Sequence, residues 1–351
     1  MTIWALRRSA AIVGAAGFAA LAGLIGCSFQ SSPGNGALPL HGASLPATSS
    51  GGPHLYVADG TTIYRFALVN GLPNTTPEKV FATGPTVGFL GVDGSGAIYA
   101  AGTSGTGAGF IEKYDGNGTL EGTAKLEEKV GAFAVDSQGY MYVGIGGGAD
   151  FAFTYAPNIF KEASAQPIAT LMAKGGYQFV KLAVGDRGRL YTAAFQNVNV
   201  FYHPHQSASG PSATFKTPPI SWSPVFPAAL AFDENNRFYG SLSYLDYCNR
   251  RCSRTKYKFL YTDFDNVLHP LAANRSDHIV YGRGCRIRTS APYGWTPGYV
   301  TGMAVYGGYI DAACSGDTVG VWVFRANRFG HQYPLERLSG LVNPTDAKVG
   351  P

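Results

Sequence analysis

The sequence is poor in charge. Only 14% of its 351 residues are charged, whereas ordinary domains carry about a quarter. The formal net charge is +5, and it falls to +3 when residues 1–26, which hold two arginines and no acidic residue, are left out. So small an excess does not indicate a nucleic-acid partner.

Several signatures of catalysis are also absent. There is no nucleophile elbow, no phosphate-cradling loop and no CxxC pair, and the glycine-rich 144–150 lacks the following helix that a dinucleotide fingerprint requires. Of seven histidines, only His203 and His205 are close neighbours. They would need a third ligand to hold a metal, so we expect an ordinary exposed loop here. No catalytic residue, metal site or cofactor is predicted.

The chain is rich in glycine, with 47 residues, and 13% of its residues are aromatic. Both suit short strands separated by tight turns. No helical periodicity is sustained beyond the first 26 residues. Instead one phrase returns along the chain: "GVDGSGAIYA" at 91–100 reappears as "AVDSQGYMYV" at 134–143, "AVGDRGRLYT" at 183–192 and "AFDENNRFYG" at 231–240.

The tyrosine after each turn sets the period of this repeat. Tyr56, Tyr99, Tyr142, Tyr191 and Tyr239 are followed by Asp311 in a degenerate sixth unit, at intervals of 43, 43, 49, 48 and 72 residues. A period of 40–50 residues with several strands predicts a β-propeller. The first unit has no innermost strand of its own, and the strand-like segment 343–350 belongs to no unit. We therefore expect this C-terminal strand to complete blade one. The predicted fold is an all-β, six-bladed propeller over 54–351.

The repeated aspartates have a structural explanation. Asp93, Asp136 and Asp233 open the turn of their units, where an aspartate can bond its own backbone two residues on. Gly96, Gly139, Gly188 and Asn236 stand where a left-handed conformation is expected, because glycine and asparagine tolerate it best. We therefore do not predict these aspartates to be metal ligands.

The segments "LGVDGSGAIYAAG…IEKYDGNG" and "FAVDSQGYMYVGI…FTYAPN" resemble NHL-type repeats of the six-bladed TolB-like propellers, a group that includes gluconolactonase-like enzymes. The resemblance covers nearly all of 54–351, and it is strongest in blades two to four and weakest in blade six. It implies a fold rather than a function, because binding modules, scaffolds, lactonases and lyases share this architecture. The Glu, Asn and Asp set that such a lactonase would place in the central channel is not detectable.

The N-terminus resembles a bacterial lipoprotein signal peptide. A short basic region with Arg7 and Arg8 precedes a 16-residue apolar run, and "LIGC" at 24–27 resembles a lipobox. Cys27 is then the expected lipidated residue. An uncleaved anchor and an ordinary signal peptide are the alternatives, and the twin-arginine motif is incomplete.

These features divide the chain into a signal peptide (1–26), a lipidated N-terminus with a linker (27–53) and the propeller (54–351). The linker is rich in serine, proline and glycine and lacks charge, as is typical of a flexible tether. We expect an exported, lipid-anchored protein of the cell envelope that faces the periplasm or the cell surface. Ser28 mildly favours the outer over the inner membrane.

The most individual segment is a long, basic, cysteine-containing insertion in blades five and six. Four cysteines besides Cys27 predict two disulfides in an oxidising compartment. Three pairings are possible, and Cys248–Cys252 with Cys285–Cys314 is preferred over the other two and over a four-cysteine metal site. The basic candidates for ligand binding are Arg250, Arg251, Arg254, Lys256, Lys258, Arg283, Arg286 and Arg288.

A loop that is held by disulfides and rich in arginine and tyrosine suits recognition. We therefore predict a binding or scaffold module whose partner is an envelope protein, a glycan or another anionic ligand, with the membrane reached through the lipid. A metal-dependent hydrolase or lyase with a central-channel site is the alternative, and a purely structural envelope protein is the third possibility.

Overall fold

The computed structural model describes residues 52–146, 151–161, 165–173, 179, 181–194, 197–216, 225–244, 247–248, 252–253, 258–262, 279–282, 287–288, 295–296, 299–315, 319–326 and 330–351. Within these ranges every element is a strand except two 3-10 turns, η1 (Ile159–Lys161) and η2 (Asp186–Gly188). Nowhere in them is there a helix with the length and apolar content needed to cross a bilayer.

The strands form six sheets that follow one another along the chain. The first contains β1 (His54–Asp59), β2 (Thr62–Val69), β3 (Leu72–Pro73), β4 (Lys79–Ala82) and β30 (Pro344–Gly350). The second contains β5 (Phe89–Val92), β6 (Ile98–Thr103), β7 (Gly109–Tyr114) and β8 (Leu120–Leu126). The third contains β9 (Val130–Val135), β10 (Met141–Ile145), β11 (Phe151–Tyr155) and β12 (Ala169–Met172).

The remaining strands continue the series. The fourth sheet contains β13 (Lys181–Val184), β14 (Leu190–Ala194), β15 (Asn197–Phe201) and β16 (Ala213–Lys216). The fifth contains β17 (Val225–Phe232), β18 (Phe238–Tyr244), β21 (Lys258–Thr262), β22 (Ile279–Gly282) and β28 (Gly330–Gln332). The sixth contains β25 (Tyr299–Tyr306), β26 (Tyr309–Ser315), β27 (Gly320–Arg325) and β29 (Glu336–Leu338). Two small hairpins pair β19 (Tyr247–Cys248) with β20 (Cys252–Ser253), and β23 (Ile287–Arg288) with β24 (Trp295–Thr296).

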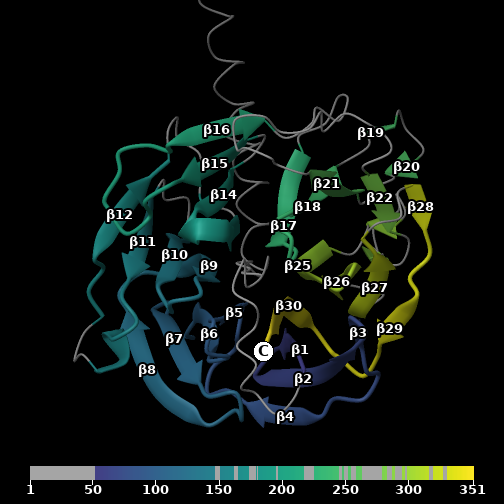
Figure 1. Ribbon diagram of the computed structural model, residues 1–351, viewed down its shortest axis with the longest axis horizontal. Coiled ribbons are helices and arrows are strands. Elements are labelled where there is room, and N and C mark those ends of the chain that lie inside the picture. Colours follow the sequence, from purple (N-terminus) through teal and green to yellow (C-terminus); the bar gives the residue numbers. More distant parts are fainter. Residues whose placement is uncertain are drawn as a thin grey trace, which may run out of the picture. The chain divides into compact units, whose positions relative to one another are not determined.

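The sheets are arranged around a common axis (Figure 1). Their innermost strands β30, β5, β9, β13, β17 and β25 contact one another in that order, and β25 contacts β30, so the circle closes. Successive strands within each sheet are mostly antiparallel neighbours. The predicted all-β propeller is therefore confirmed.

The ends of the folded region meet in the first sheet. β1 pairs antiparallel with β30, with Leu55 opposite Val349 and Ala58 opposite Asp346. Next to these paired strands, the Asp59 carboxylate accepts a hydrogen bond from the backbone N–H of Val342, at 2.7 Å. The C-terminal strand supplies the innermost strand of the first sheet, as the repeats predict, and it covers an edge that would otherwise be open.

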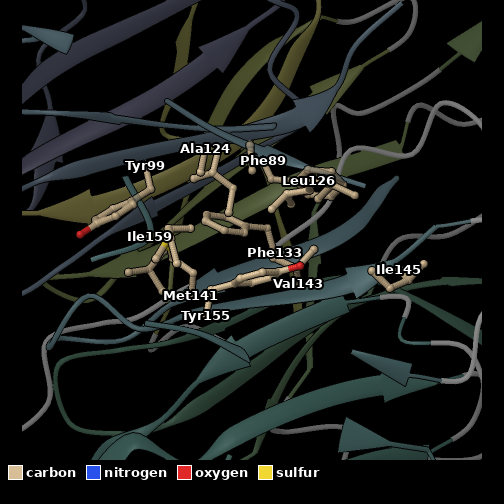
Figure 2. Packing of buried hydrophobic residues seen from close by; sticks show 14 of the residues in the cluster. Phe89, Tyr99, Ala124, Leu126, Phe133, Met141, Val143, Ile145, Tyr155 and Ile159 are labelled. Atoms are coloured by element: carbon tan, nitrogen blue, oxygen red, sulfur yellow. The ribbon is translucent and has the colours of Figure 1, made fainter. Parts of the chain in front are cut away.

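The core consists of the interfaces between neighbouring sheets. Figure 2 shows the interface of the second and third sheets, where Phe89 and Leu126 lie against Phe133 and Met141. The repeat tyrosines belong to the same system of interfaces, and each is at most 2% exposed: Tyr56, Tyr99, Tyr142, Tyr191 and Tyr239. The repeated phrase is thus a buried inner hairpin.

Connections between the third and fourth strands lie against the outer edge of the preceding sheet. In the fourth sheet this connection forms a parallel bridge to β12, with Ala208 beside Leu171. The N–H of Met172 donates to the carbonyl of Ala208 at 2.9 Å. In the sixth unit the connection between β27 and β29 contains β28, which pairs in parallel with β22 and so joins the fifth sheet. These connections protect edge strands from pairing with other chains.

Candidate functional site

Each repeat aspartate organises its own turn. Oδ1 of Asp136 accepts the N–H groups of Gln138 and Tyr140, both at 2.9 Å, and its Oδ2 accepts the hydroxyl of Tyr142 at 2.9 Å. The same pattern recurs at Asp93 and Asp233 with their tyrosines at 2.9 and 3.3 Å. The turn residues after these aspartates have φ of 86°, 84° and 60° at Gly96, Gly139 and Asn236, as predicted. These carboxylates are structural.

The contribution of each tyrosine hydroxyl to stability should be larger where fewer other donors remain for its aspartate. Oδ2 of Asp93 has Tyr99 as its hydrogen-bond donor in the described part of the chain, so Tyr99→Phe leaves a buried carboxylate oxygen without a donor. We expect a loss of about 1–2 kcal/mol in the free energy of unfolding. Tyr142→Phe should cost less, because Nε2 of His205 also lies 3.3 Å from Oδ2 of Asp136. Urea denaturation of both variants measures this, and equal losses would contradict it.

The two neighbouring histidines, His203 and His205, have different surroundings. His205 stacks on Tyr140, with ring centroids 3.9 Å apart, and its Nε2 lies 2.8 Å from the hydroxyl of Tyr142. His203 is exposed. The connection is a loop, as predicted, but it docks on the neighbouring sheet through His205, which is half-buried. No group of three or more His, Cys, Asp or Glu side chains with metal-binding geometry occurs in the described ranges.

A buried ionic cluster occupies the axis of the ring. Asp346 and Lys348 lie on β30, and Nζ of Lys348 donates to Oδ1 of Asp346 at 2.8 Å. Asp346 also accepts the N–H groups of Ala347, at Oδ1, and of Leu90, at Oδ2, both at 2.9 Å. Lys181 begins β13 and interacts electrostatically with both charged groups. All three charged side chains are at most 2% exposed.

The sequence contains the signal for this cluster. Residues two apart on a strand point to the same face, so placing 343–350 innermost also places Asp346 and Lys348 side by side. The predicted site residues do not include Asp346, Lys348 or Lys181, and the structure adds these three charged residues on the innermost strands β30 and β13.

Burial shifts the pKa of each member of this cluster. It raises the pKa of Asp346 to about 6, against the opposing effect of the Lys348 ammonium and the N–H donors. It lowers the pKa of Lys348, although Asp346 opposes this. It lowers the pKa of Lys181 to about 7, with Asp346 opposing and Lys348 adding to the shift.

A second buried carboxyl lies where the repeat tyrosine is missing. Asp311 is fully buried in β26, and neither of its oxygens has a hydrogen-bond partner in the described part of the chain. The register places it beside Ala304 and Val323, with Glu336 opposite Val323. Burial, with a smaller contribution from Glu336, raises the pKa of Asp311 to about 8.

The predicted cysteines are only partly within the described residues. The hairpin of β19 and β20 places Cys248 opposite Cys252, a backbone arrangement compatible with a disulfide. Cys314 is fully buried in β26 and disulfide-bonded, and the side chains of the other four cysteines lie outside the described set. Cys27 and Cys285 are outside it altogether. The preferred pairing stays a prediction.

The basic candidates also fall largely outside the described residues. Lys258 begins β21 and Arg288 ends β23, so their backbone positions are known. The candidates outside the described residues are Arg250, Arg251, Arg254, Lys256, Arg283 and Arg286. The predicted basic patch therefore stays a prediction.

Comparison with known proteins identifies the fold. No family model and no curated protein matches the sequence. A chain of the crystal structure of a nidogen/laminin complex aligns with a TM-score of 0.57 and 11% identity, over 86% of this chain and 99% of that one. A protein from Lactobacillus plantarum aligns with a TM-score of 0.51 and 10% identity, over 85% and 99%. At these identities the likeness defines the architecture, a β-propeller, and nothing finer.

Proposed function

We propose that this chain is an exported, lipid-anchored, six-bladed propeller of the NHL type that acts as a binding or scaffold module at the cell envelope. The observation that carries this proposal is what the ionisable side chains of the described residues contact. The turn aspartates accept hydrogen bonds from their own turns, and the innermost strands hold two buried lysines and one buried aspartate. A central-channel metal enzyme needs several convergent oxygen or imidazole ligands. Two buried lysines and one aspartate are not such a set.

Two further observations support this proposal. Six sheets in a closed circle match the number of repeats in the sequence. One of the similar chains comes from the crystal structure of a nidogen/laminin complex, which agrees with the proposed role as a binding module. The proposed contact surface is the basic insertion of blades five and six, which carries Arg283, Arg286 and Arg288. Its ligand class is anionic.

Lipidation is tested by replacing the acceptor. The full chain, expressed in a bacterium with labelled palmitate, should carry the label and sediment with membranes. Cys27→Ser should abolish both, whereas Cys314→Ser should retain the label, because Cys314 is a buried residue of the ring. Label that persists in Cys27→Ser would contradict the anchoring.

The basic surface is tested with heparin as an anionic glycan probe. We expect the full chain to be retained, with retention falling as salt rises because exposed charges are screened. The triple variant Arg283→Gln, Arg286→Gln, Arg288→Gln should lose retention. A matched variant that removes three exposed lysines from the second and third sheets, Lys125, Lys129 and Lys161, should keep it. Equal losses in the two variants would indicate nonspecific charge rather than a site.

A further inference from the structure

The sixth sheet carries the aspartate–tyrosine pair of the repeats in reverse. In the third sheet, Tyr142 lies opposite Ala134, and the turn aspartate follows Ala134 by two residues. In the sixth sheet, Asp311 lies opposite Ala304, and Tyr306 follows Ala304 by two residues. The carboxyl has thus moved from a turn, where free N–H groups bind it, to a strand, where the sheet already uses the N–H groups. This position explains why the carboxyl of Asp311 has no donor among the described residues.

Asp311 faces the first sheet. Residues two apart on a strand point to the same face, so Asp311 shares its face of β26 with Ala313. Ala313 packs with Leu55, Val57 and Val321 in the apolar cluster between the sixth and first sheets. We call this interface the seam. It is also where β25 and β26 contact β30, the strand that closes the ring.

The two sheets approach each other very closely at the seam. A Cβ on Gly307 would lie 2.7 Å from the Cα of Gly71, and a Cβ on Gly302 would overlap the backbone of β30. The backbones of the two sheets therefore touch, and Asp311 between them is 0% exposed. An ionised carboxyl is costly in an interior that does not bind it. The seam must therefore open before water can reach a carboxylate at this position.

Burial and Glu336 together favour the protonated form of Asp311. Burial raises the pKa of Asp311 to about 8, and the negative charge of Glu336 on β29 adds to this shift. On β30 the ammonium of Lys348 is bound to Asp346. The other titratable side chains packed against this cluster are the phenols Tyr64 and Tyr306. The carboxyl of Asp311 is thus mostly protonated at neutral pH while the seam is closed.

We propose that Asp311 makes the seam a pH-dependent switch: the protonated carboxyl keeps the sixth and first sheets packed, and its ionisation exposes the apolar faces of both. Opening releases one proton from Asp311 to water. The equilibrium constant for opening should therefore rise about tenfold for each pH unit between about pH 4 and pH 8. Above pH 8 it should level off, because the closed form has then lost the same proton. This device is separate from the proposed ligand surface of the basic insertion.

Amide hydrogen exchange of the purified full chain at pH 5, 6 and 7 tests the switch, after correction for the pH dependence of the intrinsic exchange rate. Protection of the amides in β26 and β30 should fall about tenfold per pH unit. Protection in β9 and β10, at the interface of the second and third sheets, should not change with pH. In Asp311→Asn, which has no proton to lose, protection at the seam should be the same at all three pH values.

Two further variants complete the test. Asp311→Leu also lacks the proton and should show the same constant protection, so the test does not depend on the folding of one variant. Glu336→Gln removes the neighbouring carboxyl but keeps Asp311, and it should keep the pH dependence. A seam that still responds to pH in the Asp311 variants would overturn the switch. An equal fall in β9 and β10 would also overturn it, because the proton would then be released by unfolding of the whole ring.

Discussion

Asp311→Asn should stabilise the protein at neutral pH. The carboxyl of Asp311 is fully buried without a hydrogen-bond partner in the described part of the chain. Its pKa rises from 3.8 to about 8 on folding, mainly through burial. At pH 7 the folded state must therefore take up a proton that the unfolded state has lost. Between pH 3.8 and pH 7, at about 1.4 kcal/mol per pH unit, the variant should gain on the order of 4 kcal/mol.

The sign of the pH dependence follows from the same shift. Between pH 4 and pH 8 the folded state binds more protons at Asp311, so this group makes the wild type less stable as pH rises. The gain in Asp311→Asn should be small at pH 4 and largest at pH 8, which urea denaturation at pH 4, 6 and 8 measures. Asp115→Asn is the control, because backbone hydrogen bonds lower the pKa of Asp115. A gain that does not vary with pH would contradict this explanation.

Asp346→Leu should have the opposite and larger effect. It leaves the ammonium of Lys348 buried without its carboxylate, and it removes the acceptor of the Leu90 N–H. Breaking one partner of a buried ion pair costs about 3–5 kcal/mol. We expect a Tm lower by 10 °C or more, on the order of 2–4 °C per kcal/mol, or failure to fold.

The double variant Asp346→Leu, Lys348→Met separates charge from packing. Because it removes both ions of the pair, it should recover a large part of the stability lost in Asp346→Leu. The exposed pair of Lys113 and Glu121, at 2.8 Å, is the control, since its loss should cost less than about 1 kcal/mol. A double variant no more stable than Asp346→Leu would assign the loss to packing.

The architecture was readable from the sequence because its determinants are local and repeated. Turn chemistry at Asp93 and Asp136 recurs with the buried tyrosines Tyr99 and Tyr142, and the aspartate–tyrosine hydrogen bond explains why the two residues recur together. The closing strand was readable because the count of strands left one unit incomplete. A period of this kind predicts a fold without any long-range information.

The axial cluster was harder to read because no period marks it. Lys181 lies 165 residues before Asp346 in the sequence, and the two interact electrostatically only because the ring closes. Asp311 stands at the tyrosine position of its unit, but its burial without a hydrogen-bond partner among the described residues depends on packing between sheets. Charges that come together once leave no pattern in a single sequence.

The pairing of β1 with β30 also constrains the order of assembly. His54 is opposite Gly350, so the first strand of the ring gains its inner neighbour only after nearly the whole chain has been synthesised. Contacts of such large sequence separation form slowly, because the loop-closure entropy precedes any gain. Until then the inner edge of the first sheet is unpaired, whereas the other five sheets can form from local hairpins. Docking of the C-terminal strand is therefore the expected last and slowest event in the folding of this ring.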